Sequence, residues 1–375
     1  MEKNVIINGN SIDLLNEMEA DSVDLIFADP PYWMRVEGEL TRVEGTAFRG
    51  CGDEWDRFDS LESYEAFTRA WLSACRRVLK PDGSIWVIGG MQCIYTIGAI
   101  MQQLGFWFIN DVVWFKKNPT PNFMGTRLNN SHETLIWAAK SRSSKYKFHY
   151  KTAKELNTDT VDETAFSRGV RRQLGSVWRL PVCAGNERLR DENGEKLHST
   201  QKPEALLYRI LAISSDPEDL ILDPFAGTMT TAAVAKRLGR NYIMLEQNAD
   251  YCRYGEWRLQ NIFCEDTAVA RADYDKKPLK VTVPEMIEAG VLTEGEDFCL
   301  RDGVPAARLC KDGKLLYQGS RMDMHSCAAL AKGGKAKRLN GFDHWYVLRN
   351  GTPVSLSEIR ECFRSQKNDD ASGKM

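Results

Sequence analysis

Short runs of apolar, β-branched residues alternate with longer stretches of helical periodicity between residues 5 and 246. The runs that predict strands are VIIN (5–8), VDLIFA (23–28), SIWVIGG (84–90), FWFINDVVWF (106–115), 132–139, LILD (220–223) and YIMLE (242–246). The stretches that predict helices are 60–79, about 92–104, 203–213 and 229–238. Strands that alternate with helices form a sheet covered on both faces. We therefore expect an α/β fold with a doubly wound, mostly parallel sheet.

The alternation ends near residue 264, where the chain becomes polar and irregular. At 375 residues the chain is long enough for a large domain and a smaller one. Residues 281–361 contain short strand-like pieces, turns and a final helix, which predict a small C-terminal α+β domain. We assign 1–263 to the first domain, 264–280 to a linker and 362–375 to a disordered tail.

The charge of the chain is nearly balanced, with 50 Lys and Arg against 52 Asp and Glu. Any nucleic-acid surface must therefore come from local clusters of basic residues. The start has no basic stretch followed by an apolar run, and no segment approaches a membrane span, so we expect a cytoplasmic protein without membrane partners. The ten cysteines form no CxxC pair, which argues against a metal cluster or a disulfide framework.

The sequence Asp29-Pro30-Pro31-Tyr32 directly follows a predicted strand. An exocyclic amine attacks a methyl sulfonium only if its lone pair is freed from the ring, so acceptors must hold its hydrogens. The Asp29 carboxylate and the Pro30 carbonyl can each accept one hydrogen, and the two prolines make the backbone rigid. Tyr32 offers a face for stacking an extruded base. The alternative is a turn that merely ends the strand.

A second motif, Asp223-Pro-Phe-Ala-Gly227-Thr-Met-Thr-Thr231, joins a predicted strand to a predicted helix. Backbone N–H groups at the start of that helix face the crevice beyond the strands, and Gly227 allows close approach. Glu246 ends the next strand, where an acidic side chain can bind both hydroxyls of a ribose. Because the pattern is not GxGxxG, it favours a nucleoside cofactor over a dinucleotide.

The two motifs in this order, together with His198-Ser-Thr-Gln-Lys202-Pro-Glu, resemble the β-group of DNA amino-methyltransferases. DEWDRF (53–58), residues 118–140 and the C-terminal extension more narrowly resemble the GANTC-methylating adenine-N6 enzymes, both cell-cycle methyltransferases and restriction-enzyme partners. The resemblance covers roughly 1–262. It implies S-adenosyl-L-methionine as cofactor and catalytic roles for Asp29, Pro30, Pro31 and Tyr32. The cofactor residues it implies are Asn10, Asp29, Thr200, Gln201, Lys202, Asp223, Phe225, Gly227, Thr228, Thr230, Glu246 and Asn248.

The chain departs from the family pattern in two places, at three positions. Ala226 and Met229 stand in the cofactor loop where the family usually has an aromatic residue and a second glycine, which could reduce cofactor affinity. Asn10 stands where relatives commonly have Asp, so an amide carbonyl would have to accept the amine of the cofactor's adenine.

Basic residues interleaved with aromatic ones predict DNA contacts in two places, residues 145–172 and residues 331–349. The second place has five basic residues against one Asp, and the resemblance supports it as part of a DNA-binding accessory domain. The residues assigned to DNA are Arg42, Arg127, Asn129, Lys145, Lys147, Arg168, Arg171, Arg172, Lys335, Lys337, Arg338 and Trp345. The alternatives are an ordinary solvated loop and a domain that only dimerises or stabilises.

His132 and Glu133 could form a proton relay, but a structural or base-positioning role is favoured, and His198 is expected to be a hydrogen-bonded turn residue. Competing functions are N4-cytosine methylation, a catalytically inactive DNA-binding relative, and methylation of RNA or of a protein glutamine. Asp29 favours adenine, since many N4 enzymes carry Ser at that position. The expected partners are double-stranded DNA, a second copy in a homodimer and a restriction endonuclease, with the protein associated with the nucleoid.

Overall fold

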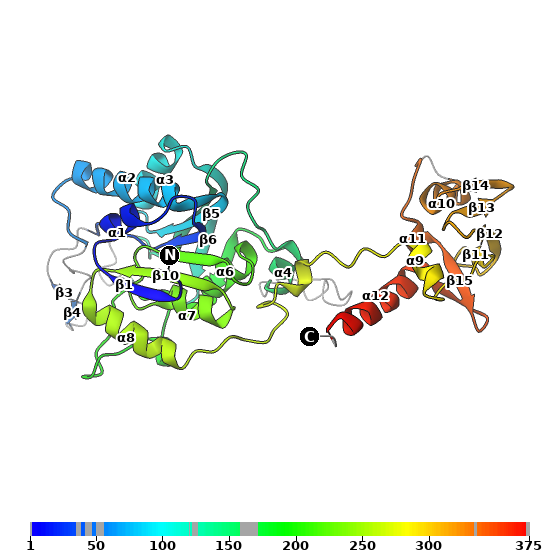
Figure 1. Cartoon of the computed structure of the whole chain (residues 1–375). Helices are drawn as coiled ribbons and strands as arrows, with labels where there is room; N and C mark the ends of the chain where they lie inside the picture. The colour runs from blue at the N-terminus through cyan, green and yellow to red at the C-terminus, as the bar shows by residue number, and fades with distance from the viewer. Residues whose placement is uncertain are drawn as a thin grey trace. The chain divides into compact units, whose positions relative to one another are not determined.

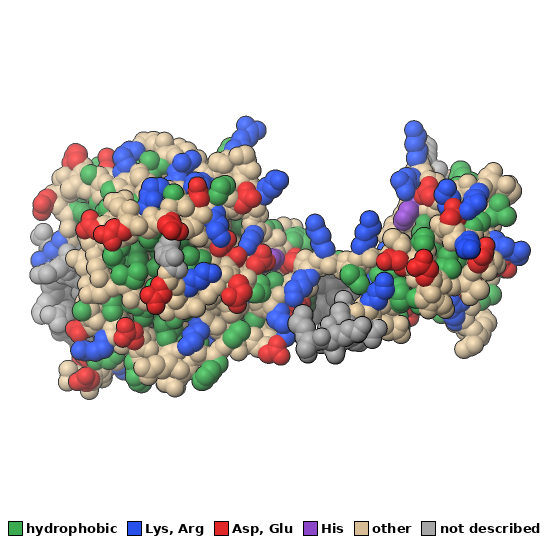
Figure 2. All heavy atoms as spheres, viewed as in Figure 1, with side chains coloured by type: hydrophobic (Ala, Val, Ile, Leu, Met, Phe, Trp, Pro, Cys, Tyr) green, Lys and Arg blue, Asp and Glu red, His purple; other side chains and the backbone are tan. Residues whose placement is uncertain are grey.

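The computed structural model describes residues 2–34, 39–41, 47–49, 56–119, 121, 127–157, 172–333 and 336–372. The chain divides into two compact units, Met1–Lys276 and Lys277–Met375. Of the helices that the described residues form, none is long and apolar enough to cross a membrane. Figure 2 shows Lys and Arg side chains interspersed with Asp and Glu over the visible face of each unit.

The first unit is built on an eight-stranded sheet in the order β1-β10-β9-β2-β5-β7-β6-β8. Its strands are β1 (Val5–Asn8), β2 (Val23–Ala28), β5 (Leu79–Gly89), β6 (Trp107–Lys116), β7 (His132–Ala139), β8 (Val177–Leu180), β9 (Leu220–Asp223) and β10 (Asn241–Glu246). All neighbouring pairs are parallel except those that involve β7. In a separate two-stranded sheet, β3 (Glu39–Thr41) pairs antiparallel with β4 (Ala47–Arg49). The two sequence motifs follow β2 and β9, and Glu246 ends β10; the carboxyl ends of these parallel strands lie at one edge of the sheet.

Helices cover both faces of this sheet (Figure 1). They are α1 (Ser11–Glu17), α2 (Leu61–Val78), α3 (Ile94–Gln103), α4 (Tyr150–Glu155), α6 (Glu204–Ser214), α7 (Thr230–Arg237) and α8 (Ala249–Gln260), with short 3-10 turns η2 (Gly185–Glu187) and η3 (Asp273–Asp275). Alternate residues of β2 point to opposite faces, so Ile26 packs with the α1–α3 layer and Phe27 with the layer of α6, α7 and α8. The predicted doubly wound, mostly parallel α/β fold is confirmed.

The second unit has a six-stranded antiparallel sheet in the order β14-β13-β12-β11-β15-β16. Its elements are α9 (Val283–Glu288), β11 (Asp297–Cys299), β12 (Pro305–Leu309), β13 (Leu315–Tyr317), β14 (Ser320–Met322), α10 (Met324–Lys332), α11 (Gly341–His344), β15 (Tyr346–Arg349), β16 (Thr352–Ser355) and α12 (Leu356–Ser372). Trp345 and Phe298 are fully buried in a core that belongs to this unit alone. A small α+β domain is therefore present, as expected.

Two predicted boundaries differ from the structure. Residues 264–276, expected as linker, belong to the first unit, where Ala270 is buried against α6 and α7 and its carbonyl accepts from the Arg240 guanidinium. The tail expected to be disordered from residue 362 continues α12 as far as Ser372, with Phe363 packed into the core of the second unit. Both segments are polar in composition, so the sequence did not indicate that they pack against a core.

Candidate active site

A cavity of about 290 Å³ lies at the carboxyl ends of β1, β2, β9 and β10. This volume is at the lower end of small-molecule sites, roughly 300–1,000 Å³. The cavity brings together residues that the sequence analysis assigned to catalysis and to the cofactor. They are Asn10, Asp29, Pro30, Pro31, Tyr32, Thr200, Gln201, Lys202, Asp223, Phe225, Gly227, Thr228, Thr230 and Glu246.

The turn after β2 is held by a carboxylate that the sequence analysis did not assign to the site. Asp56 accepts the backbone N–H groups of Tyr32 at 2.6 Å, Trp33 at 2.6 Å and Met34 at 2.8 Å. Trp33 has a left-handed backbone with φ 51°, which lets consecutive N–H groups converge on one anion. The signal in the sequence was the segment 53–58, which contributed to the resemblance without a role for Asp56.

Asp29 lies in this turn with its side chain 17% exposed, and it forms an ion pair with Lys202 at 2.7 Å. The Tyr32 hydroxyl is 3.0 Å from the other carboxylate oxygen of Asp29. Burial raises the pKa of Asp29 above its usual value, and Lys202 opposes this shift. Lys202 lines the cavity, and its ammonium pairs with the Asp29 carboxylate. Its contact with the cofactor stays a prediction.

The second motif forms a tight loop between β9 and α7, which we call the cofactor loop (223–231). Asp223 accepts from Phe225 N at 3.0 Å and from Thr231 Oγ1 at 2.5 Å, and burial raises its pKa to about 7. Gly227 has a φ of 52° and donates its N–H to Glu246 Oε2 at 2.7 Å. Glu246, at the end of β10, therefore connects the loop to the sheet.

Two asparagines expected to bind the cofactor use their side chains to cap helices. Asn10 caps α1, because its Oδ1 accepts from Ile12 N at 2.9 Å and from Asp13 N at 3.4 Å. These two hydrogen bonds use both lone pairs of Oδ1. Asn10 can therefore offer the cofactor only its side-chain N–H groups, and not the acceptor that was predicted. Asn248 caps α8 and is not among the described residues that line the cavity.

Other lining residues escaped the sequence analysis because they belong to no motif of their own. They include Ser11, Phe67, Gln247 and Tyr251. Three of these lie in helices, and Gln247 lies between β10 and α8. Tyr251 packs against His198, with ring centroids 5.0 Å apart. His198 accepts the N–H of Thr200 at 3.1 Å, as expected for a hydrogen-bonded turn residue, and also lines the cavity.

Met229 shows how the chain accommodates one departure from the family pattern. Its backbone is left-handed, with φ 61°, and its side chain is fully buried. Gly255 of α8 makes room for it, since a Cβ at position 255 would lie 2.2 Å from Met229 Cγ. The side chain of Met229 thus anchors the cofactor loop to α8 at the cost of backbone strain.

Gly255→Ala is expected to destabilise the protein by about 1–3 kcal/mol, because an added methyl group overpacks a filled site. Chemical denaturation of the cofactor-free protein measures the change. The double variant Met229→Gly with Gly255→Ala should recover most of the loss, since glycine adopts a positive φ without strain and removes the clashing side chain. A double variant as unstable as Gly255→Ala alone would contradict this pairing.

The residues predicted to contact DNA are dispersed. Arg127 and Asn129 are exposed between β6 and β7, at the edge of the sheet that carries the cavity. Lys337 and Arg338 are exposed on the second unit, where Arg338 pairs with Asp323 at 3.1 Å. Arg172 is also exposed. The predictions that lie outside the described residues are Arg42, Arg168, Arg171 and Lys335.

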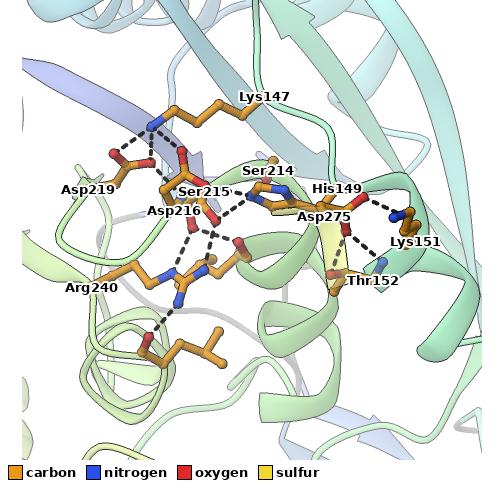
Figure 3. A network of polar contacts seen from close by, with 12 residues as sticks. Lys147, His149, Lys151, Thr152, Ser214, Ser215, Asp216, Asp219, Arg240 and Asp275 are labelled. Atoms are coloured by element: carbon orange, nitrogen blue, oxygen red, sulfur yellow. Dashed lines mark hydrogen bonds and ion pairs between the residues drawn. The ribbon is translucent and has the colours of Figure 1, made fainter. Parts of the chain in front are cut away.

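Lys145 and Lys147 lie at the opposite edge of the sheet, at the amino ends of β5 and β9. Lys147 is paired with Asp219 at 2.6 Å and with Asp216 at 3.0 Å (Figure 3). Lys145 donates its backbone N–H to Asp82. Both residues therefore lie at the edge opposite the cavity, and their contact with DNA stays a prediction.

The prediction of Trp345 as a DNA contact is wrong. It is fully buried, its indole N–H donates to the Met324 carbonyl at 3.0 Å, and its ring packs near Phe298. Its aromatic character serves the core of the second unit.

Comparison with known proteins identifies the family. Residues 23–256 match the model of the N6/N4 DNA methylases. The chain is 43% identical over 363 residues to the type II methyltransferase M.HinfI of Haemophilus influenzae, covering 97% of each chain. The chain belongs to the DNA methylase family. It is also 35% identical over 259 residues to the type II methyltransferase M2.LlaDCHI of Lactococcus lactis subsp. cremoris, covering 69% of this chain and 90% of that one.

Among solved structures, the chain resembles the M1.HpyAVI–SAM complex with a TM-score of 0.47 and 22% identity, covering 68% of this chain and 98% of that one. As a family member the protein is a sequence-specific DNA methyltransferase with S-adenosylmethionine as methyl donor. The cavity fits this donor, because it combines a carboxylate at the end of β10, a glycine turn and the Phe225 ring. When bound, the cofactor supplies an electrophilic methyl group.

Glu246→Ala is expected to weaken S-adenosylmethionine binding by roughly 10-fold or more, the effect of losing a charged hydrogen-bond partner. Turnover at saturating cofactor should fall less if Glu246 acts as predicted, as a contact to the donor and not to the reacting amine. Calorimetry gives the dissociation constant, and the exposed Glu256→Ala on α8 is the matched control. An unchanged dissociation constant in Glu246→Ala would place the ribose elsewhere.

Proposed function

We propose that this enzyme methylates the N6 amine of an adenine flipped out of duplex DNA, within GANTC sequences. The observation that carries the proposal is the single cavity in which Asp29 and Pro30 face the cofactor loop and Glu246. A buried base edge and the methyl donor can therefore meet in a site shielded from water. A base inside a duplex cannot reach such a cavity, so it must leave the stack.

The roles of the turn residues follow from the needs of a conjugated amine. The Asp29 carboxylate and the Pro30 carbonyl accept the two amine hydrogens, which directs the nitrogen lone pair toward the methyl group. Asp56 and Tyr64 fix this turn, since Asp56 binds three consecutive N–H groups and the Tyr64 hydroxyl donates to the Pro31 carbonyl at 2.9 Å. A rigid turn holds its acceptors in place before the base arrives.

Adenine is favoured over cytosine by Asp at position 29. The 43% identity to M.HinfI over nearly the whole chain supports the same assignment and the GANTC site. N4-cytosine methylation stays the alternative, because the same acceptors serve any exocyclic amine and only the size of the pocket separates the bases.

Transfer of tritiated methyl groups to short duplexes tests the substrate. A duplex with one GANTC site should be labelled, a scrambled duplex of equal composition should not, and nucleoside analysis should find N6-methyladenine. Recovery of N4-methylcytosine would establish the alternative base. Labelling of RNA or protein in place of duplex DNA would overturn the proposal.

The partners beyond DNA stay predictions. Sedimentation with and without a GANTC duplex tests the homodimer. A partner restriction endonuclease should cut the same site in unmethylated DNA and should fail on DNA that this enzyme has methylated. We place the enzyme in the cytoplasm at the nucleoid, where its DNA substrate lies.

A further inference from the structure

Glu133 reaches the catalytic turn from a distant part of the chain. It lies at the start of β7, yet its Oε2 is 3.0 Å from the Tyr32 hydroxyl and 3.9 Å from Lys202 Nζ. Its Oε1 is held by Lys116, the last residue of β6, at 2.6 Å. The Glu133 and Lys116 side chains are only 13% and 17% exposed. The pair is therefore a built part of the site and not a surface ion pair.

The Tyr32 hydroxyl lies within hydrogen-bond distance of two carboxylates. The phenol has one hydrogen, but a carboxylate oxygen of Asp29 and one of Glu133 each lie 3.0 Å from its oxygen. One donor satisfies only one acceptor at a time, so the second contact becomes a hydrogen bond when a carboxyl group holds a further proton. Asp29, Tyr32 and Glu133 thus form a chain along which a proton can move.

We propose that Glu133 is a positioning residue for methyl transfer, which acts through Tyr32 by accepting the proton that Asp29 takes from the amine. The inference rests on the proposed function of Asp29. When the amine N–H bond breaks, Asp29 becomes a neutral acid. It donates this proton to the Tyr32 oxygen while the phenol's own proton passes to Glu133. Tyr32 ends neutral, Asp29 is again a carboxylate, and Glu133 releases the proton to water.

The charges around the chain make the internal transfer from Asp29 to Glu133 uphill, so release of the proton from Glu133 to water must complete it. Burial raises the pKa of Asp29, which suits a group that takes a proton. Burial also opposes ionisation of Glu133, but Lys202 and Lys116 outweigh it and lower its pKa, so Glu133 does not keep the proton. The other groups that face this cluster are Cys93, whose pKa burial raises to about 12, and Asp223. Cys93 is therefore neutral at working pH and does not compete.

Glu133→Gln tests the inference, because it keeps the size of the side chain and an oxygen acceptor for Tyr32 but cannot take up a proton. Turnover should fall on the order of 10- to 100-fold. Glu133 is not among the described residues that line the cavity, so the dissociation constant of S-adenosylmethionine should be unchanged. Loss of the negative charge lowers the pKa of Asp29, so the acidic limb of kcat/KM should move to lower pH, on the order of one pH unit. A merely structural role would leave this limb in place.

A double variant separates the proton path from charge balance. Glu133→Gln leaves Lys116 without its counterion, and Lys116→Met together with Glu133→Gln removes that unpaired charge. The double variant should regain thermal stability but stay as slow as Glu133→Gln. Recovery of turnover to near the wild-type value would show that Glu133 is only a counterion and would overturn the inference.

The ion pair of Lys80 and Asp24, at 2.8 Å and at the other edge of the sheet, provides the matched control. Asp24→Asn should leave both turnover and the pH profile unchanged. Asp29→Ala separates the two hypotheses: if Asp29→Ala is inactive and Glu133→Gln is normal in rate and pH profile, only the present inference fails. If Asp29→Ala is active, the proposed function itself is wrong.

Discussion

Asp29→Ala is expected to lower methyl transfer by at least about 100-fold at saturating cofactor, the effect of removing one preorganised transition-state partner. The reason is that the Asp29 carboxylate accepts an amine hydrogen and so frees the nitrogen lone pair. Single-turnover transfer of labelled methyl to a GANTC duplex measures the chemical step directly. Cofactor binding should be largely retained, because Glu246 and the cofactor loop lie on other strands.

A second substitution controls for the ion pair that Asp29→Ala breaks. Lys202 is only 8% exposed, so loss of its partner leaves a buried ammonium near Glu133 and costs stability. Asp29→Asn keeps an oxygen acceptor and the shape of the side chain, so it should lose less activity than Asp29→Ala. Near-normal turnover of folded Asp29→Ala that still binds S-adenosylmethionine would refute the catalytic assignment.

The positions of Asp29 and Glu246 could be predicted because each ends an unambiguous apolar run. Parallel strands bring their carboxyl ends to one edge, so two residues far apart in the sequence had to meet near the cofactor loop. The same argument places Asp223. Periodicity and turn chemistry therefore predicted the part of the site that strands deliver.

Contacts from loops and from neighbouring strands could not be predicted. Asp56 reaches Tyr32 across 24 positions and Glu133 reaches it across 101, and no local pattern fixes either distance. Trp345 failed for the opposite reason. Its local neighbourhood looked like a DNA surface, but a hydrophobic core buries the ring. Composition indicates which contacts a residue can make and does not indicate which partner is near.

The end of the first unit was also misplaced because a contact distant in sequence determines it. Residues 264–276 are polar, yet Asp275 accepts the backbone N–H groups of Lys151 and Thr152 at the start of α4, each at 2.8 Å (Figure 3). The end of the unit therefore supplies the cap of a helix that begins more than 100 positions earlier. A chain that stops at residue 263 would lose this cap, so an experimental truncation should end at Lys276.

A chain truncated after Lys276 is expected to fold and bind S-adenosylmethionine but to lose most of its affinity for DNA. The first unit keeps its own core and the whole cavity, whereas the second unit carries Lys337 and Arg338 on its surface. Each phosphate contact that is lost should reduce the salt dependence of binding by a slope of roughly 0.9. The truncated protein should therefore show weaker binding and a shallower salt curve in fluorescence anisotropy with a GANTC duplex.

The full-length variant Lys337→Ala with Arg338→Ala is the matched control for loss of charge without loss of the unit. It should weaken binding less than the truncation, and the loss of two phosphate contacts should reduce the salt slope by roughly 1.8.

The ratio of affinities for GANTC and scrambled duplexes then shows which unit reads the bases. Because phosphate contacts carry no sequence information, a truncation that lowers affinity and preserves this ratio leaves base reading to the first unit. Unchanged affinity and unchanged salt slope would show that the second unit is structural, and exposed residues of the first unit, such as Arg127, Asn129 and Arg172, must then hold the DNA.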